Sequence, residues 1–132
     1  MDLFVGNTQG TRLLTIQVKT AEWGERTRGI GPSKQLHHLD FQLGHKAART
    51  NDAAIFFAFV DLRGRRPESV PDVYVVPSPV IYERCVSWAE SAAMVRWNPL
   101  VAEAEPYKNT WSLLTDFLGV GPPPSEEPEG AV

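Results

Sequence analysis

Three polar residues, Asp2, Gln17 and Lys19, have the types and spacing that metal-assisted hydrolysis requires. Gln17 and Lys19 are two residues apart, so on a β-strand both side chains point to the same face. Mg²⁺ prefers oxygen ligands and is usually held by one or two carboxylates together with water and phosphate. Asp2 would supply a carboxylate, while the Gln17 side chain and the Val18 main chain would each supply a carbonyl oxygen. Lys19 would orient or deprotonate the attacking water, or stabilise charge developing on a phosphate.

Each of these residues also has an ordinary explanation. Asp2 near a chain terminus would simply be solvated. Lys19 would be a surface lysine whose long stem carries the ammonium group from the strand into water. The two explanations differ in whether the side chains converge on one place.

The segments that would position these residues are predicted to form a β-hairpin. Residues 2–7 are a short strand, residues 7–10 contain the turn formers Asn and Gly, and residues 11–21 are a stronger strand. The second strand alternates between an apolar and a more polar face. The apolar face carries Leu14, Ile16 and Val18.

The rest of the chain adds further strands. Residues 53–62, AAIFFAFVDL, are almost continuously apolar and predict a buried central strand. Residues 38–43 and 72–76 are predicted as shorter strands. Residues 22–34 are polar and contain glycines, which predicts a loop, and residues 44–52 are predicted as a connection or short helix.

Two amphipathic helices are predicted to follow the last strand. The first covers residues 80–94, with Ser78 as its N-cap and Pro79 in its first position. The second covers residues 109–118, with Asn109 as its cap. The element order predicts a mixed central β-sheet with flanking helices, of the α/β or α+β class, and the sequence does not decide between these two classes.

Composition places the chain among compact domains. Residues 1–120 are predicted as one domain, and residues 121–132 as a disordered tail rich in Pro and Glu. The lone cysteine, Cys85, excludes a disulfide within the chain and makes a structural zinc site a poor prediction. No apolar run has the length of a membrane span, and no signal peptide is expected, so we predict a cytoplasmic location.

Charge is unevenly distributed along the chain. Residues 1–66 contain ten Lys/Arg and six Asp/Glu, a net of +4, whereas residues 67–120 contain three and seven, a net of −4. A phosphate-binding face needs only local positive charge, so the overall net charge of −3 does not exclude nucleic acid as a partner.

The run D-x14-Q-x-K, written as DLFVGN, a turn and LLTIQVKTA, resembles the active-site hairpin of the PD-(D/E)XK nuclease superfamily, which has the restriction-endonuclease-like fold. The resemblance implies Asp2 as the motif aspartate, Gln17 in the position usually held by Asp or Glu, and Lys19 as the motif lysine. It also implies Mg²⁺ or Mn²⁺ as cofactor and DNA as substrate. Later segments are similar to a bacterial branch of small nuclease-like proteins, and the similarity covers most of residues 2–118. These segments are Val60-Asp61-Leu62, VYVVPS at 73–78, Tyr107-Lys108-Asn109, Trp111 and Leu113-Leu114.

The sequence departs from this family pattern in two ways. The family core begins with a helix, whereas Met1 directly precedes Asp2. Three explanations stay open: the start is misassigned, the gene is truncated, or a second copy or a partner chain covers the place of that helix. Gln17 is neutral, so Asp2 is the one certain anionic ligand, and another acid or the DNA phosphate must complete a Mg²⁺ site. The leading prediction is metal-dependent hydrolysis of DNA phosphodiester bonds. The alternative is a catalytically inactive module that binds nucleic acid or a protein partner.

Other basic residues are predicted to contact phosphate. The resemblance implies that the loop holding His45 and Lys46 lies near the site. Arg63 and Arg65 belong to a basic turn suited to phosphate contacts. The alternative for each is a solvated loop residue, and the histidines lack the spacing of a metal site.

Overall fold

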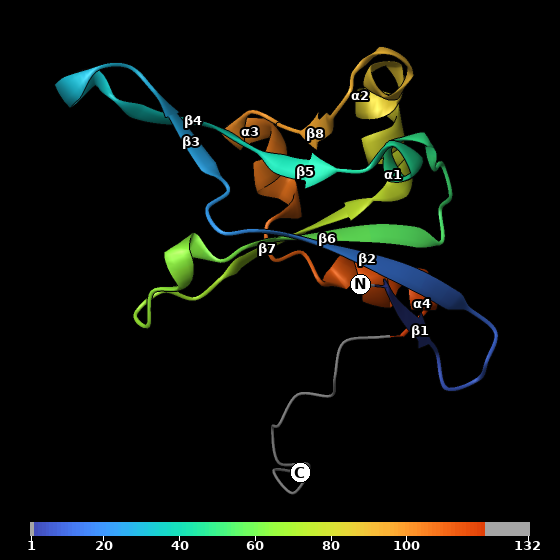
Figure 1. Cartoon of the computed structure of the whole chain (residues 1–132). Helices are drawn as coiled ribbons and strands as arrows, with labels where there is room; N and C mark the ends of the chain where they lie inside the picture. The colour runs from blue at the N-terminus through green and yellow to red at the C-terminus, as the bar shows by residue number, and fades with distance from the viewer. Residues whose placement is uncertain (1, 121–132) are drawn as a thin grey trace, which may run out of the picture.

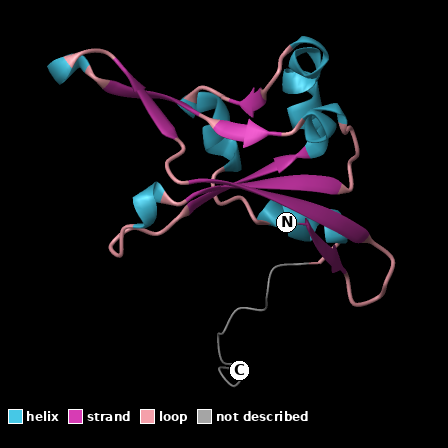
Figure 2. Ribbon diagram, viewed as in Figure 1, coloured by secondary structure: helices cyan, strands magenta, loops and turns pink. Residues whose placement is uncertain are grey.

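The computed structural model describes residues 2–120, and at its centre lies a mixed four-stranded sheet in the order β1-β2-β6-β7 (Figure 1, Figure 2). Its strands are β1 Asp2–Gly6, β2 Leu13–Ala21, β6 Ile55–Asp61 and β7 Asp72–Pro77. β1 and β7 pair antiparallel with their neighbours, whereas β2 and β6 pair in parallel. The predicted mixed sheet with flanking helices is therefore confirmed, and so is the β1–β2 hairpin.

Two smaller sheets and the helices surround this centre. β3 Glu25–Arg28 pairs with β4 Gln35–Leu39, and β5 Phe41–Leu43 pairs with β8 Val95–Trp97. The α-helices are α1 His45–Arg49, α2 Ser78–Ser91, α3 Val101–Ala104 and α4 Ser112–Leu118. Short 3-10 turns, η1 Gly31–Ser33, η2 Arg63–Arg65 and η3 Glu105–Tyr107, complete the described chain.

The apolar residues form two cores, one on each face of the sheet. Phe57 and Phe59 of β6 point to the face covered by β5, β8, α1 and α2, and the Phe59 ring stacks 4.4 Å from that of Trp97. Phe56 and Ala58 point to the other face, where α4 packs through Leu118. Burial on both faces explains the continuous apolar run of β6, and each fully buried Phe contributes about 1.5–3 kcal/mol to stability.

The parallel pairing of β2 with β6 determines what covers the site-bearing face of β2. A chain that leaves one strand and returns parallel to it must cross over a face of the sheet. Residues 22–54 make this crossing and contain β3, β4, β5 and α1. The crossing brings α1 over the outer part of the sheet face that carries Gln17 and Lys19.

The crossing segment differs from its prediction. The predicted loop at residues 22–34 contains β3, and the predicted strand at residues 38–43 is divided at Asp40 between β4 and β5, which belong to different sheets. Residues 25–28 are mostly exposed, so the hydrophobic alternation that normally reveals a strand is missing there. Residues 44–52 do contain the short helix α1.

The predicted helix starts also need correction. α2 begins at Ser78 itself, and the Ser78 hydroxyl donates to the main-chain oxygen of Thr50 instead of capping the helix. α4 begins at Ser112, whereas Asn109 has a φ of 52° and accepts a hydrogen bond from the Val73 main-chain N–H through its side chain. These side chains bind partners that are distant in sequence, which a local capping rule does not detect. β8 and α3 were not predicted.

Gly24 provides a direct test of packing where β2 leads into β3. A Cβ atom at this buried position would lie 2.9 Å from Cζ of Phe41 and 3.1 Å from Oδ2 of Asp61. We expect Gly24→Ala to lower the free energy of unfolding by about 1–3 kcal/mol, because overpacking forces its neighbours to move. Urea denaturation would measure the change.

Gly44→Ala is the control, because a Cβ at Gly44 has no atom within 4 Å and its φ is −77°. Because Gly44 is the N-cap of α1, where alanine is less favourable, this variant should lower the free energy of unfolding by at most about 1 kcal/mol. Equal stability of Gly24→Ala and the wild-type protein would contradict the close packing described.

Candidate active site

Asp2, Gln17 and Lys19 line the same pocket, which has a volume of about 250 Å³. Gly44, Lys46 and Ala47, at the start of α1, line its other wall. The structure therefore brings together the three residues predicted for catalysis and one of the residues predicted for phosphate binding.

Strand register explains why the three side chains converge. Asp2 of β1 is the direct cross-strand partner of Gln17, so their side chains lie on the same face of the hairpin. Lys19 lies two residues further along β2 and points the same way. On the opposite face, Leu14 and Ile16 are buried against α4, which fixes the orientation of the strand.

The main-chain oxygen of Val18 faces the strand that begins at Asp2. The main-chain N–H of Thr15 donates to the carbonyl of Ala54, just before β6, and the carbonyl of Ala21 accepts from the N–H of Leu62, just after β6. Both groups therefore point to the β6 side of β2. Successive main-chain groups on a strand point to opposite sides within the sheet. Val18 is an odd number of residues from both, so its carbonyl points toward β1. The Val18 side chain packs with the second core.

The charged groups of the pocket are two lysines and one aspartate. Within residues 2–120, neither Lys19 nor Lys46 is in an ion pair, and Asp2 is also unpaired. Unpaired local positive charge attracts phosphate. In that same range, no three His, Cys, Asp or Glu side chains are arranged to hold a metal.

The oxygen donors present fit a Mg²⁺ ion that is held in part by its substrate. Asp2 provides a carboxylate and Gln17 an amide oxygen, whereas Val18 is not among the residues that line the pocket. Such an ion usually keeps several waters and takes its remaining ligands from phosphate. The residues that line the pocket include no second carboxylate.

Two side chains of α1 hold this helix in place over β2. Nε2 of His45 lies 2.7 Å from the main-chain oxygen of Ala92, and Nη2 of Arg49 donates to that of Ala89 at 2.9 Å. Both contacts attach α1 to the C-terminal end of α2. His45 does not line the pocket, and its expected phosphate contact stays a prediction, whereas its observed contact positions Lys46.

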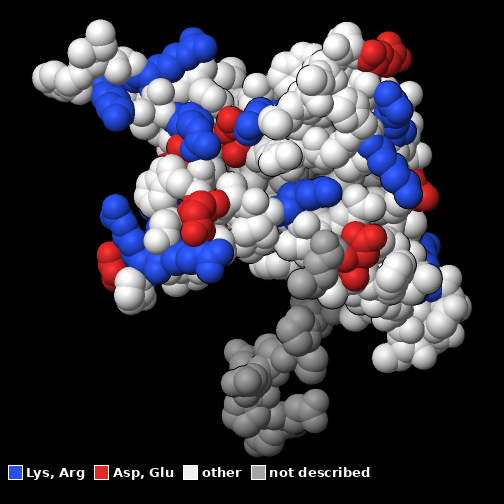
Figure 3. All heavy atoms as spheres, in the orientation of Figure 1, with Lys and Arg blue, Asp and Glu red and all other residues white. Residues whose placement is uncertain are grey.

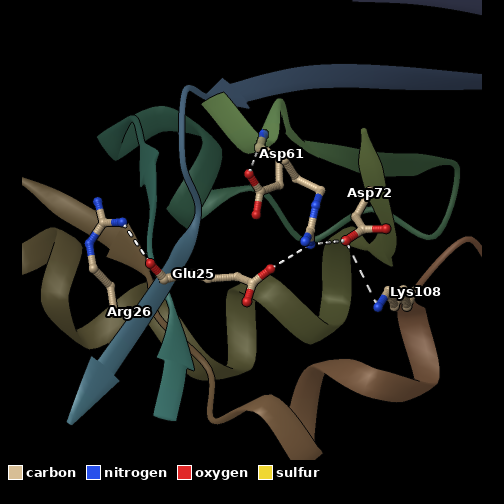
Figure 4. Close-up of polar contacts among 6 residues, drawn as sticks. Glu25, Arg26, Asp61, Asp72 and Lys108 are labelled. Atoms are coloured by element: carbon tan, nitrogen blue, oxygen red, sulfur yellow. Dashed lines mark hydrogen bonds and ion pairs between the residues drawn. The ribbon is translucent and has the colours of Figure 1, made fainter. Parts of the chain in front are cut away.

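Arg63 contacts a cluster of three carboxylates, those of Glu25, Asp61 and Asp72, which Figure 4 labels. Its Nη1 atom lies 2.6 Å from Glu25 and 3.1 Å from Asp72, and its main-chain N–H donates to buried Asp61. Glu25, and secondarily Asp72 and Asp61, raise the pKa of the Arg63 guanidinium. Lys108 lies 3.9 Å from Asp72 in the same cluster. The cluster joins η2 to β3 and β7.

Arg65 is also paired with an acid. Its Nε atom donates to both carboxylate oxygens of Glu22, at 2.9 and 2.8 Å, which raises its pKa. Phosphate binding by Arg63 and Arg65 stays a prediction, and their observed contacts hold the η2 turn against the segment that follows β2.

The loop around Gly44, His45 and Lys46 was expected near the site, and Gly44 and Lys46 of that loop line the pocket. Ala47 also lines it and was not expected, because nothing in its residue type marks it in the sequence. A second pocket of about 340 Å³ shares no lining residue with the first, and it contains the Arg84–Glu103 ion pair at 3.1 Å.

Comparison with protein-family models, with curated proteins and with solved structures gave no match for this chain. Among residues 2–120, no helix combines the length and the apolar character needed to cross a membrane.

Tyr74 reports on the carboxylates near Arg63. Burial, followed by the charges of Asp72, Glu25 and Asp61, raises its pKa from 10.0 to about 12. The unfolded chain loses this proton first as the pH rises, so the stability that Tyr74 contributes is complete below pH 10.0 and is lost as the pH rises toward about 12.

Spectrophotometric titration of tyrosinate absorbance would test this prediction. One of the three tyrosines should ionise near pH 12, and Tyr74→Phe should remove that step alone. Three tyrosines that all ionise near pH 10 in the folded protein would contradict the buried environment of Tyr74.

Proposed function

We propose that the protein is a metal-dependent nuclease that hydrolyses DNA phosphodiester bonds with Mg²⁺ or Mn²⁺. The observation that carries this proposal is the convergence of Asp2, Gln17, Lys19 and Lys46 on one pocket. Asp2 and Gln17, which are 15 positions apart in the sequence, bring a carboxylate and an amide oxygen to one face. Lys19 adds an amine on the same face, and the crossover adds a second amine through Lys46. These groups match the requirements of phosphodiester hydrolysis: oxygen ligands for a cation, and positive charge for the phosphate.

Each residue has a distinct role in this proposal. Asp2 and the side-chain oxygen of Gln17 would hold the cation, which when bound polarises the phosphate and lowers the pKa of bound water. Lys19 is the catalytic amine, orienting the attacking water or accepting its proton. Lys46, opposite it on α1, holds a phosphate oxygen and so fixes the scissile bond in the pocket.

The family assignment is part of the same proposal. The resemblance of the hairpin to the PD-(D/E)XK nucleases rests on the motif residues Asp2, Gln17 and Lys19. Fold alone does not establish an activity, so the proposal depends on the chemistry of the pocket and not on the mixed sheet.

A catalytically inactive binding module is the second candidate, and two observations favour it. The pocket has no second carboxylate among its lining residues. In addition, Phe4 is 71% exposed and Leu13 61% exposed, and strand register puts both on the face of the hairpin that bears Asp2. An apolar surface of this kind is typical of a site for another chain, which agrees with the expected second copy or partner.

Cleavage of supercoiled DNA separates the two candidates. We expect the wild-type protein to nick the plasmid with Mg²⁺ or Mn²⁺ and to be inactive with excess chelator. Lys19→Ala should reduce the single-turnover rate by about 100-fold or more, because the general acid–base and charge-stabilising contributions of the amine are lost. Asp2→Asn should reduce the rate and raise the metal concentration required.

Lys108→Ala is the matched control, since it removes a partly exposed lysine outside the pocket. It should cleave at close to the wild-type rate, and all variants should be compared for thermal unfolding. Cleavage that is equal in wild type and Lys19→Ala would exclude this pocket as the active site. Absence of metal-dependent cleavage by the folded wild-type protein would favour the binding module.

A further inference from the structure

We propose that two basic projections next to the pocket bind the phosphate backbone of duplex DNA without reading its sequence. This inference rests on the proposed function and names the surface that would hold its substrate. The projections, called the basic arms below, are the β3–β4 hairpin with its tip η1 (residues 25–39) and the η2 turn (residues 63–66).

The arms lie where the site-bearing strand ends. β2 carries Gln17 and Lys19 and leads within four residues of Ala21 into β3. Four residues separate Lys19 from Trp23, which is at most about 13 Å along an extended chain. Figure 1 shows the hairpin extending from the body at the opposite end from α1 and α2, with η2 below it, and Figure 3 shows Lys and Arg side chains gathered on both projections.

The bases of the arms are joined by ion pairs. Arg63 of η2 binds Glu25 of β3, and Arg65 binds Glu22 just after β2. These pairs neutralise the inner cations and link one arm to the other. The two arms therefore have a fixed relation at their bases, which reduces the conformational entropy that a ligand would have to remove.

The outer cations of the arms have no such partners. Among residues 2–120, no carboxylate lies within ion-pair distance of Arg26, Arg28, Lys34 or Arg66, and all four are exposed. Arg26 donates to main-chain carbonyls, which leaves its charge uncompensated. Four unpaired cations on two linked projections are the electrostatic pattern of a phosphate-binding surface.

A purely structural role does not account for the hairpin. An isolated two-stranded ribbon is at best marginally stable in water, and residues 26–36 of this ribbon and its tip are all exposed. Residues 26–36 of the hairpin therefore carry charge outside the core, and none of them is buried. A surface that extends the positive pocket toward a long polyanion would explain that feature.

Trp23 lies between the arms and provides a local probe. Trp23 is 39% exposed, and the guanidinium carbons of Arg63 and Arg66 lie 5.8 and 5.5 Å from the centroid of its ring. DNA that contacts both arms would come close to this indole. Its fluorescence should change on binding, and Trp23→Phe should remove that change.

The test is the fluorescence anisotropy of a labelled duplex of mixed sequence, titrated with the full chain in chelator so that no cleavage occurs. The triple variant Arg26→Gln, Arg28→Gln, Lys34→Gln should bind about tenfold more weakly or worse at low salt. The slope of log affinity against log salt should become shallower by about 2–3, because each lost phosphate contact removes close to 0.9.

The matched control changes charge elsewhere on the surface. Gln9→Glu, Ser87→Glu and Ala102→Glu are exposed positions outside the arms, and together they lower the net charge of −3 by the same three units. This control should keep the wild-type salt slope.

The outcomes separate this inference from the proposed function. A wild-type protein that does not bind the duplex, a triple arm variant with an unchanged salt slope, or an equal loss in the control would each overturn the arm surface. Binding that depends on the arms without metal-dependent cleavage would support the arm surface and overturn the nuclease proposal. Cleavage that depends on Lys19 but not on the arms would support the nuclease proposal and overturn the arm surface.

Discussion

The parallel pairing of β2 with β6 is the constraint on which the rest of the structure depends. It requires the chain to cross one face of the sheet between these strands, and the crossing carries α1 to the polar side of β2. An antiparallel connection would need only a short turn and would leave Gln17 and Lys19 on an open face. The pocket therefore results from the topology as much as from the hairpin that supplies Asp2, Gln17 and Lys19.

Because of the same pairing, one face of the sheet carries both buried core residues and residues that line the pocket. Gln17 and Lys19 are in register with Phe57 and Phe59, which are fully buried in the next strand. The transition from packed aromatic rings to polar groups thus occurs within one strand spacing of about 4.8 Å. A lysine in this position packs its stem near the apolar core while its ammonium group remains in the pocket. Lys19 is half-buried, and among residues 2–120 its amine has no ion-pair partner.

Sequence reasoning identified the features that depend on local pattern. Alternation in residues 13–21 and the continuous apolar run before Asp61 predicted β2 and β6, and the spacing of Gln17 and Lys19 predicted their shared face. Prediction from the sequence failed where contacts between residues distant in the sequence determine the structure. The hydroxyl of Ser78 binds Thr50 instead of capping α2, and the exposed strand β3 has no core to impose alternation. The contribution of Ala47 to the wall of the pocket was also missed, because an alanine carries no functional signal, whereas the loop around Gly44 and Lys46 was expected there from the family resemblance.

Binding of Mn²⁺ observed through amide NMR signals tests most directly whether this pocket is a metal site. Paramagnetic broadening at sub-stoichiometric Mn²⁺ should be strongest for Asp2, for residues 17–19 and for residues 44–47, and Asp2→Asn should remove it. Broadening centred on the carboxylates around Arg63, or uniform weak broadening over the surface, would contradict the proposal that this pocket binds the metal ion.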